Sequence, residues 1–273
     1  MEILGLLQTE NFQEALELLS PLVEEGDSIA QFYLAQMYFE GNGVDINKDL
    51  AEKWYLRSAS QGLADAQYHL GLMFTNDIYK LEAVSWLRKA SEQGHKEAQY
   101  NLAVMYADGV GVPTNYDKAI KWYSESAEAG LADAQFNLGH MYANGIGVDK
   151  DLAVTVKWYN EAAQQGMTKA QYDLGIMYAN GWGVEKNMNE SFKWWHEAAK
   201  LDHANAQFNL GMMYGRGDGV SRDFVKALTF FLRADDNGYP DAKEQADSIM
   251  VLLSQEQIDE VLATRMLDLK FNQ

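Results

Sequence analysis

The first features to test are residue combinations that could catalyse a reaction or bind a metal. The segment His196-Glu197-Ala198-Ala199-Lys200 begins like a zinc-protease motif, in which two histidines four residues apart bind zinc and the glutamate acts as a base. Lysine stands where the second histidine is required, so no ligand pair forms. The chain has five histidines, otherwise dispersed, and no cysteine, which excludes disulfides, thiolate catalysis and cysteine-bound zinc. We therefore expect no metal and no cofactor.

Other short motifs do not indicate catalysis either. The recurring Gly-x-Gly pairs lack the third glycine and the preceding strand of a dinucleotide-binding loop. No phosphate loop or serine nucleophile elbow is present, and no pattern places two carboxylates in a pocket that excludes water. The tripeptide Arg216-Gly217-Asp218 resembles an integrin-binding sequence, but it falls on one of the glycine loops and we interpret it as coincidence. The expectation is that the chain is not an enzyme.

The charge of the chain restricts its partners. Lys and Arg total 22 against 40 for Asp and Glu, giving a formal net charge of -18, and the first 47 residues carry nine acids and no Lys or Arg. Such a chain repels nucleic acids and anionic membrane surfaces and favours a basic protein or peptide as partner. No apolar run reaches the roughly 18 to 20 residues of a membrane span, and the N-terminus lacks secretion signals, which predicts a cytoplasmic location.

The residues capable of binding such a partner are positioned by an internal repeat. An Ala-Gln pair recurs six times with four gaps of 36 residues and one of 32, each followed by an aromatic residue, a leucine and a second aromatic. The second half of each repeat unit contains a tryptophan or phenylalanine at a fixed place. The pairs begin at Ala30, Ala66, Ala98, Ala134, Ala170 and Ala206.

Each repeat unit reads as two helices. Ala, Leu and Tyr at i, i+4 and i+8 share one helical face, and a Gly-x-Gly loop ends most first helices because glycine adopts the positive φ angles of a helix C-terminus. The repeat tryptophans, Trp54, Trp86, Trp122, Trp158 and Trp194, are expected in the core of the second helices. Glycine ends most second helices, whereas repeat five has Asp202, so we expect a different cap there.

This pattern resembles the Sel1-like repeat family, a relative of the tetratricopeptide repeats. The resemblance is carried by Ala-Gln-aromatic-x-Leu-Gly-x-Met-Tyr, Gly-x-Gly-Val and Trp-Tyr. It implies an all-α, right-handed superhelical solenoid. The repeats predicted from it are 27–62, 63–94, 95–130, 131–166, 167–202 and 203–238, between capping segments 1–26 and 239–273. Repeat two lacks four residues and its glycine loop near 76–81, and we expect this deletion to change the local superhelical turn.

Repeat positions that vary from unit to unit hold the specific information. They form a stripe on the first helices at one residue before the repeat alanine and three, six and ten after it, which share one face. By resemblance this first-helix stripe lines a concave groove. Asn101, Asn137, Asp173 and Asn209 would form a ladder about 8 to 10 Å apart, able to bind a peptide backbone. The alternative is that these side chains are only solvated. The predicted partner-binding residues are Tyr33, His69, Asn101, Asn137, His140, Asp173, Asn209, Met212, Arg216 and Trp182.

Trp182 belongs to this set for a different reason. It lies inside the fifth glycine loop, where the other loops carry Asn42, Val110, Ile146 and Asp218, so the fold does not require tryptophan. It is either an exposed interface anchor or a side chain buried against a neighbouring loop.

These features predict a non-enzymatic interaction scaffold, or adaptor, that binds a basic protein or peptide in its groove. The alternative is a cytoplasmic immunity or inhibitor protein that neutralises a basic toxin, which the acidity and small size also fit. The two differ in the complex they form: one tight, salt-sensitive one-to-one complex for an inhibitor, several weaker ones for an adaptor.

Overall fold

The computed structural model describes residues 2–75 and 79–271, and the side chains of 3–75 and 79–265. These residues form sixteen α-helices and no strand, so the all-α repeat fold predicted from the sequence is confirmed. The chain consists of two compact units, Met1–Ala134 (unit 1) and Gln135–Gln273 (unit 2), which are described separately here. Among the described residues, no helix is long and apolar enough to cross a membrane.

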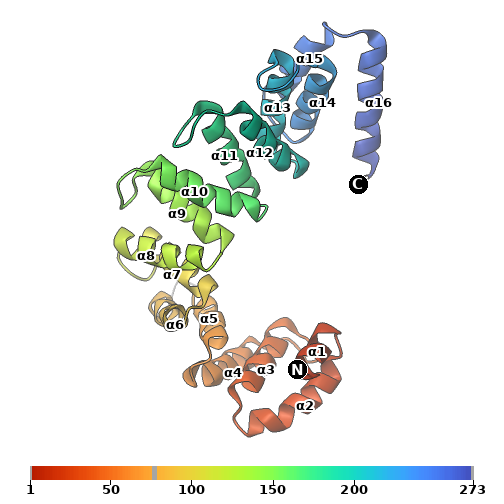
Figure 1. Cartoon of the computed structure of the whole chain (residues 1–273). Coiled ribbons are helices and arrows are strands. Elements are labelled where there is room, and N and C mark those ends of the chain that lie inside the picture. Colours follow the sequence, from red (N-terminus) through yellow and green to blue (C-terminus); the bar gives the residue numbers. More distant parts are fainter. Residues whose placement is uncertain (1, 76–78, 272–273) are drawn as a thin grey trace. The chain divides into compact units, whose positions relative to one another are not determined.

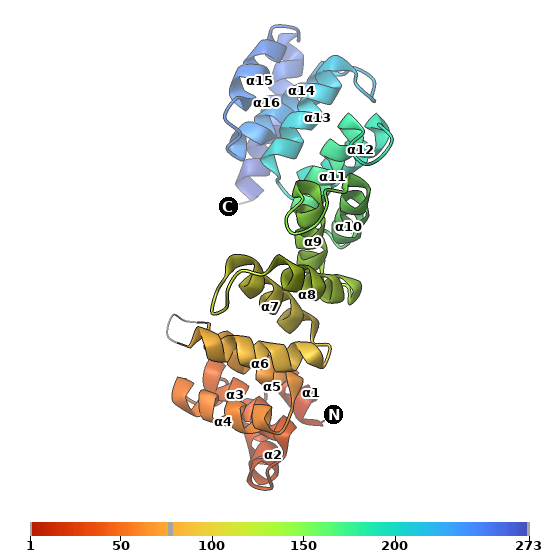
Figure 2. The same ribbon diagram turned by 90° about the vertical axis from the view of Figure 1, so that its left-hand side faces the viewer.

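Every repeat supplies one first helix and one second helix (Figures 1 and 2). The first helices are α3 (Ser28–Glu40), α5 (Ala64–Met73), α7 (Lys96–Asp108), α9 (Ala132–Asn144), α11 (Thr168–Asn180) and α13 (Ala204–Arg216). The second helices are α4 (Lys48–Ser60), α6 (Lys80–Glu92), α8 (Tyr116–Glu128), α10 (Leu152–Gln164), α12 (Met188–Lys200) and α14 (Phe224–Asp236). The chain begins with α1 (Glu2–Gln8) and α2 (Phe12–Glu24) and ends with α15 (Ala242–Met250) and α16 (Gln255–Phe271).

Within each unit, neighbouring helices pack in chain order. In unit 1, α3 packs on α4, α4 on α5, α5 on α6, α6 on α7 and α7 on α8, which can be followed along the colours of Figure 1. In unit 2, α10, α11, α12, α13 and α14 pack in the same way, and α14 also contacts α15 and α16. The main contacts of the repeat helices are therefore with their neighbours in the chain, as expected of a repeat array.

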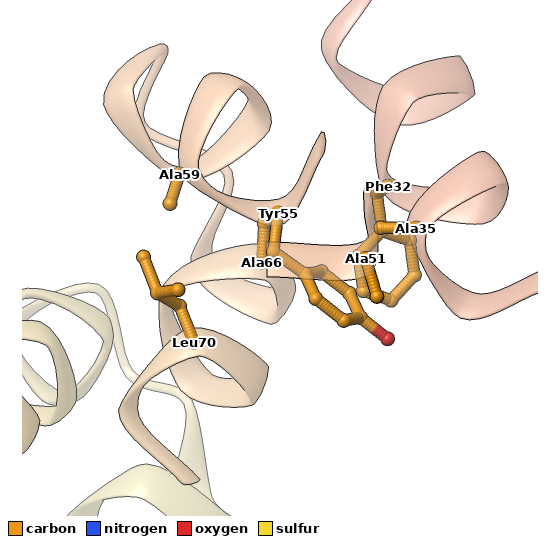
Figure 3. Packing of buried hydrophobic residues seen from close by; sticks show 7 residues of the cluster. All are labelled: Phe32, Ala35, Ala51, Tyr55, Ala59, Ala66 and Leu70. Atoms are coloured by element: carbon orange, nitrogen blue, oxygen red, sulfur yellow. The ribbon is translucent and has the colours of Figure 1, made fainter. Parts of the chain in front are cut away.

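The core of each repeat forms where a small residue of the first helix meets a large residue of the second. Figure 3 shows one such cluster in unit 1, in which the rings of Phe32 and Tyr55 pack with centroids 5.8 Å apart beside alanines of α3 and α4. In unit 2 a Cβ added to Gly175 would lie 2.4 Å from the Trp195 ring, so that glycine allows the bulkier aromatic to approach α11. Small residues on the first helices thus make room for large residues of the second helices.

The residue that fills the core is the one after the repeat tryptophan, and this corrects the sequence prediction. Tyr55 is 1% exposed and Tyr159 5%, whereas the preceding Trp54 and Trp158 are only half-buried. Of the five repeat tryptophans only Trp122 and Trp194 are buried. A basic side chain lies over each ring; the Lys157 ammonium, for example, is 4.5 Å from the centroid of Trp158. The lysine stem covers the outer face of the ring while its charge stays in water.

The end of repeat five differs from the prediction as well. Asp202 adopts φ of +56°, the left-handed conformation that glycine adopts at the same place elsewhere, such as +87° at Gly166. The closing hydrogen bonds match: the His203 N–H donates to the Ala198 carbonyl as the Met167 N–H donates to that of Ala162. The cap is therefore the same turn, because aspartate tolerates this conformation better than most non-glycine residues.

Repeat two has a shortened first helix. Helix α5 has 10 residues, against 13 in α3 and α7, and its C-cap, Phe74, is not left-handed. Residues 76–78 of the predicted deletion region lie outside the described residues. The change of superhelical turn expected there stays a prediction.

A capping box opens the last helix, as the sequence predicts. The Gln257 N–H donates to the Ser254 hydroxyl oxygen and the Ser254 N–H donates to Gln257 Oε1, at 3.3 and 3.0 Å. Helix α16 is fixed to α14 by an ion pair between Arg265 and Asp235, at 3.2 Å, and by the buried Val261. These contacts cover part of the outer face of α14.

Candidate binding sites on the first helices

The first-helix stripe is accessible, while the alanine, glutamine and leucine that recur beside it are buried. The alanine and leucine of every repeat are at most 8% exposed, as are the glutamines of the Ala-Gln pairs. Three of the predicted binding residues, His140, Arg216 and Trp182, are exposed. The remaining predicted residues are half-buried: Tyr33, His69, Asn101, Asn137, Asp173, Asn209 and Met212. The variable side chains of the repeats therefore lie where a partner can contact them.

In unit 2 two of the predicted residues meet in one pocket, here called the Trp182 pocket. It has a volume of about 450 Å³, and both Asp173 of α11 and Trp182 of the following loop line it. Its other lining residues come from the end of α9, from the loop before α10, and from α10 and α11: Ala143, Asn144, Lys150, Leu152, Thr155, Tyr159, Ile176 and Met177. A stripe residue and a loop residue that the sequence singled out separately thus share one site.

The glycines of the loop place the tryptophan at this pocket. Gly181 and Gly183, on either side of Trp182, have φ of +74° and +70°. A Cβ on Gly183 would lie 2.2 Å from the Leu152 carbonyl oxygen, so only glycine lets the loop pass this close to the start of α10. Trp182 itself is 52% exposed. The alternative in which it is buried against a neighbouring loop is therefore wrong.

Charge in the Trp182 pocket is centred on one carboxyl group. Burial raises the pKa of the Asp173 carboxyl above its ordinary value, and the positive charges of His140 and Lys169 act in the opposite direction. Burial also raises the pKa of the Tyr159 phenol, and the nearby Asp173 adds to that rise. Asp173 is thus a partly desolvated acceptor beside an aromatic and aliphatic wall.

Unit 1 has a pocket at the equivalent repeat position. It has a volume of about 240 Å³ and is lined by Leu4, Leu7, Gln8, Phe12, Tyr33, Gln36, Met37, Glu40 and Asn42. Tyr33 and Asp173 both stand three residues after the repeat alanine, and Asn42 and Trp182 occupy the same loop position. The space between a first helix, the preceding second helix and the glycine loop is therefore hollow in both units, with different chemistry in each.

Other predicted residues are engaged within the protein. The Asn101 amide donates to the Glu97 carbonyl at 2.8 Å and also hydrogen-bonds the Tyr68 phenol. His69 stacks on Tyr55 with centroids 5.5 Å apart, and burial lowers the pKa of its imidazole. Met212 packs against the core cluster of α14. Asn137 also takes part in interactions within the protein. These side chains offer a partner less than the sequence suggests.

The sequence did not single out the second-helix side of the Trp182 pocket. Lys150, Leu152, Thr155 and Tyr159 precede the stripe by about half a repeat and line the pocket only because α10 packs on α11. The available signal was the glycine loop. In a stacked array the start of a second helix faces the glycine loop of the following repeat, as Leu152 faces Gly183. Among the described residues, no group of three or more His, Asp or Glu side chains is arranged to hold a metal.

Six consecutive segments of the chain match the Sel1 repeat family: residues 28–63, 64–95, 96–131, 132–167, 168–203 and 204–239. The fold is similar to a protective antigen of uropathogenic Escherichia coli strains that displays an SLR fold, with TM-score 0.77, 33% identity, and coverage of 93% of this chain and 55% of that protein. A Sel1 repeat protein from Oxalobacter formigenes superposes with TM-score 0.73 and 35% identity over 87% of this chain and 71% of that protein.

A curated relative is viral. A Sel1-like repeat-containing protein of Acanthamoeba polyphaga mimivirus is 39% identical over 74 residues, which is 26% of this chain and 14% of that protein. The chain thus spans a small part of this relative and about half of the E. coli antigen.

Proposed function

Since this chain belongs to the Sel1 repeat family, we propose that it is a non-enzymatic scaffold that binds a basic protein partner along its first-helix stripe. Proteins built from Sel1 and tetratricopeptide-like repeats generally mediate protein–protein interactions, and Sel1 scaffolds are generally non-catalytic. The observation that carries the proposal is the contrast within each repeat: the invariant alanine, glutamine and leucine are buried, and variable residues are accessible and line pockets in both units.

Charge supports a basic partner. The net charge of -18 attracts basic proteins at long range and accelerates their association, with strong sensitivity to salt. The absence of cysteine suits a cytoplasmic setting, which we propose for the scaffold. We also propose that segments 1–26 and 239–273 cap the six repeats.

The test is capture of partners at low salt with two charge variants. Asp108 and Asp133 are exposed acids on the stripe, whereas Glu92 and Glu128 are exposed acids at the ends of second helices. Asp108→Lys with Asp133→Lys, and Glu92→Lys with Glu128→Lys, change the net charge equally. We expect the first pair to weaken capture at least tenfold and the second pair to leave it within about twofold, since only the first alters the binding surface. Equal losses in both variants would show that net charge, and not the stripe, binds the partner.

The same capture addresses the alternative of a dedicated inhibitor. The observation favouring it is the N-terminal stretch of 47 residues with nine acids and no base, which suits one basic target. A single stoichiometric partner that elutes only at high salt supports an inhibitor. Several partners eluting at moderate salt support an adaptor.

A further inference from the structure

The Trp182 pocket combines three features that suit an amphipathic cation. Its wall is apolar, formed by Leu152, Ile176 and Met177, and an exposed indole stands at its edge. Its polar centre is the partly desolvated carboxylate of Asp173. A volume of about 450 Å³ is within the range of pockets that bind small ligands and is ample for one long side chain.

We propose that the Trp182 pocket receives an arginine side chain of the partner, with the guanidinium group stacked on Trp182 and hydrogen-bonded to Asp173. The methylene stem of arginine would contact Ile176 and Met177, and its planar guanidinium suits both an aromatic face and a carboxylate. This inference rests on the proposed function, because it assumes that the occupant belongs to a protein.

Basic groups around the pocket act on Asp173 without a close ion pair. Lys150 lines the pocket and Lys169 lies near the carboxylate, and both lysines are exposed. His140 is exposed and also acts on Asp173. No salt bridge within 4 Å joins these side chains to Asp173. A purely apolar occupant would leave the Asp173 carboxylate desolvated without a partner.

The combination of a loop tryptophan with an aspartate on the first-helix stripe occurs in repeat five alone. The other glycine loops carry Asn42, Val110, Ile146 and Asp218 in place of Trp182. At the position of Asp173, repeats three, four and six carry asparagine, at Asn101, Asn137 and Asn209. The equivalent pocket of unit 1 has Tyr33 there and no aromatic residue in its loop. The occupant is therefore specified at this repeat and not by the fold in general.

Nuclear magnetic resonance of the tryptophan indole groups tests the inference directly. The probes are the blocked tripeptides Ala-Arg-Ala, Ala-citrulline-Ala and Ala-norleucine-Ala; citrulline has nearly the shape of arginine without its charge. The variant Trp182→Val identifies the Trp182 signal, and the valine at position 110 shows that the loop accepts this residue. We expect the arginine peptide to shift that signal saturably and to bind at least tenfold more tightly than the other two.

Asp173→Asn removes the carboxylate and should keep the fold, because three other repeats carry asparagine at this position. This variant should lose at least tenfold in affinity for the arginine peptide and bind the citrulline peptide as well as the arginine one. Glu185→Gln is the control: it removes an exposed charge two residues beyond Gly183 and outside the pocket lining, and it should keep affinity within about twofold. Two results would overturn the inference. One is equal binding of the arginine and citrulline peptides by the wild-type protein. The other is an equal loss of affinity for the arginine peptide in Asp173→Asn and Glu185→Gln.

Different results would reject the arginine pocket and the proposed scaffold function. If a captured partner binds wild type, Asp173→Asn and Trp182→Val equally, the scaffold function stands and the arginine pocket is wrong. If the arginine peptide binds as expected but no protein is captured, the pocket stands and the scaffold function is wrong.

Discussion

Buried amides connect successive helices through the glutamine of each Ala-Gln pair. The Gln207 amide donates to the Ala199 carbonyl of the preceding second helix at 3.2 Å, and its oxygen accepts from Asn237 at the end of the following one at 2.9 Å. In the same way, the Gln31 oxygen accepts from the Gln61 amide, and the Gln135 oxygen accepts from the Gln165 amide. Such a glutamine can bridge three helices, as Gln207 does, which explains a polar residue in the core.

Two of these bridges are incomplete: the side-chain oxygens of Gln99 and Gln171 are buried without a hydrogen-bond partner among the described residues. The Gln171 amide does donate to the Ala163 carbonyl. The residue thirty positions after Gln171 is Leu201, and Ala129 stands thirty positions after Gln99. Repeats one, four and six have Gln61, Gln165 and Asn237 at this distance. We predict that Leu201→Gln raises the free energy of unfolding by about 1 kcal/mol in urea denaturation, because it supplies the missing donor.

Leu201→Ala is the control for that prediction, since it removes the leucine without adding an amide. Leu201 is 54% exposed, so its removal costs little apolar contact. Equal stabilities of the two variants would mean that Gln171 does not gain the hydrogen bond.

At the scale of helix pairs, the distance between a first and a second helix is set by one contact. Alanine stands opposite tyrosine in repeats one and three, as in Ala35 with Tyr55, whereas Gly175 stands opposite the larger Trp195. The Trp195 indole N–H also donates to the Tyr172 carbonyl at 3.1 Å, which fixes the orientation of the ring. In repeat five, therefore, the absence of a side chain at Gly175 makes room for the Trp195 ring.

We predict that Gly175→Ala lowers the free energy of unfolding by roughly 1–3 kcal/mol, because the new Cβ overlaps the Trp195 ring. Gly215→Ala is the matched control in α13: the nearest atoms lie 3.8 Å from its Cβ, and alanine should stabilise the helix by up to about 1 kcal/mol. Denaturation of both variants measures the difference. Trp195→Tyr added to Gly175→Ala should restore much of the loss; a double variant no better than Gly175→Ala would count against the explanation.

For the whole molecule, charge opposes the compact state. The exposed ion pairs are short-range and local, such as Lys193 with Glu190 at 3.5 Å, and each contributes little. The excess of 18 negative charges acts over longer distances and repels itself within the folded chain. Repulsion should therefore outweigh the surface pairs at low ionic strength.

We predict that the melting temperature rises by several degrees as NaCl increases from about 10 mM to about 300 mM, since the Debye length falls below roughly 10 Å and screens this repulsion. Differential scanning calorimetry in NaCl and in KCl measures the effect. The two salts should act alike if screening is the cause. A melting temperature that falls with salt would show that the ion pairs dominate.

The repeat class, the positions of the helices and their starts and stops follow from the sequence. They depend on local properties: which residues share a helical face, where glycine permits a positive φ, and where Ser254 and Gln257 cap a helix. The stripe was predicted for the same reason, because its residues lie within single helices.

Only the tertiary structure decided which side chains of different helices meet. It assigned the core position to Tyr55 and Tyr159 in place of the tryptophans before them, used the Asn101 amide within the protein, and brought Asp173, Trp182 and Tyr159 to one pocket. Helical periodicity gives the face on which a residue lies but not the residue of the neighbouring helix that packs against it. That pairing depends on side-chain volume and helix separation, and it alone created the pocket.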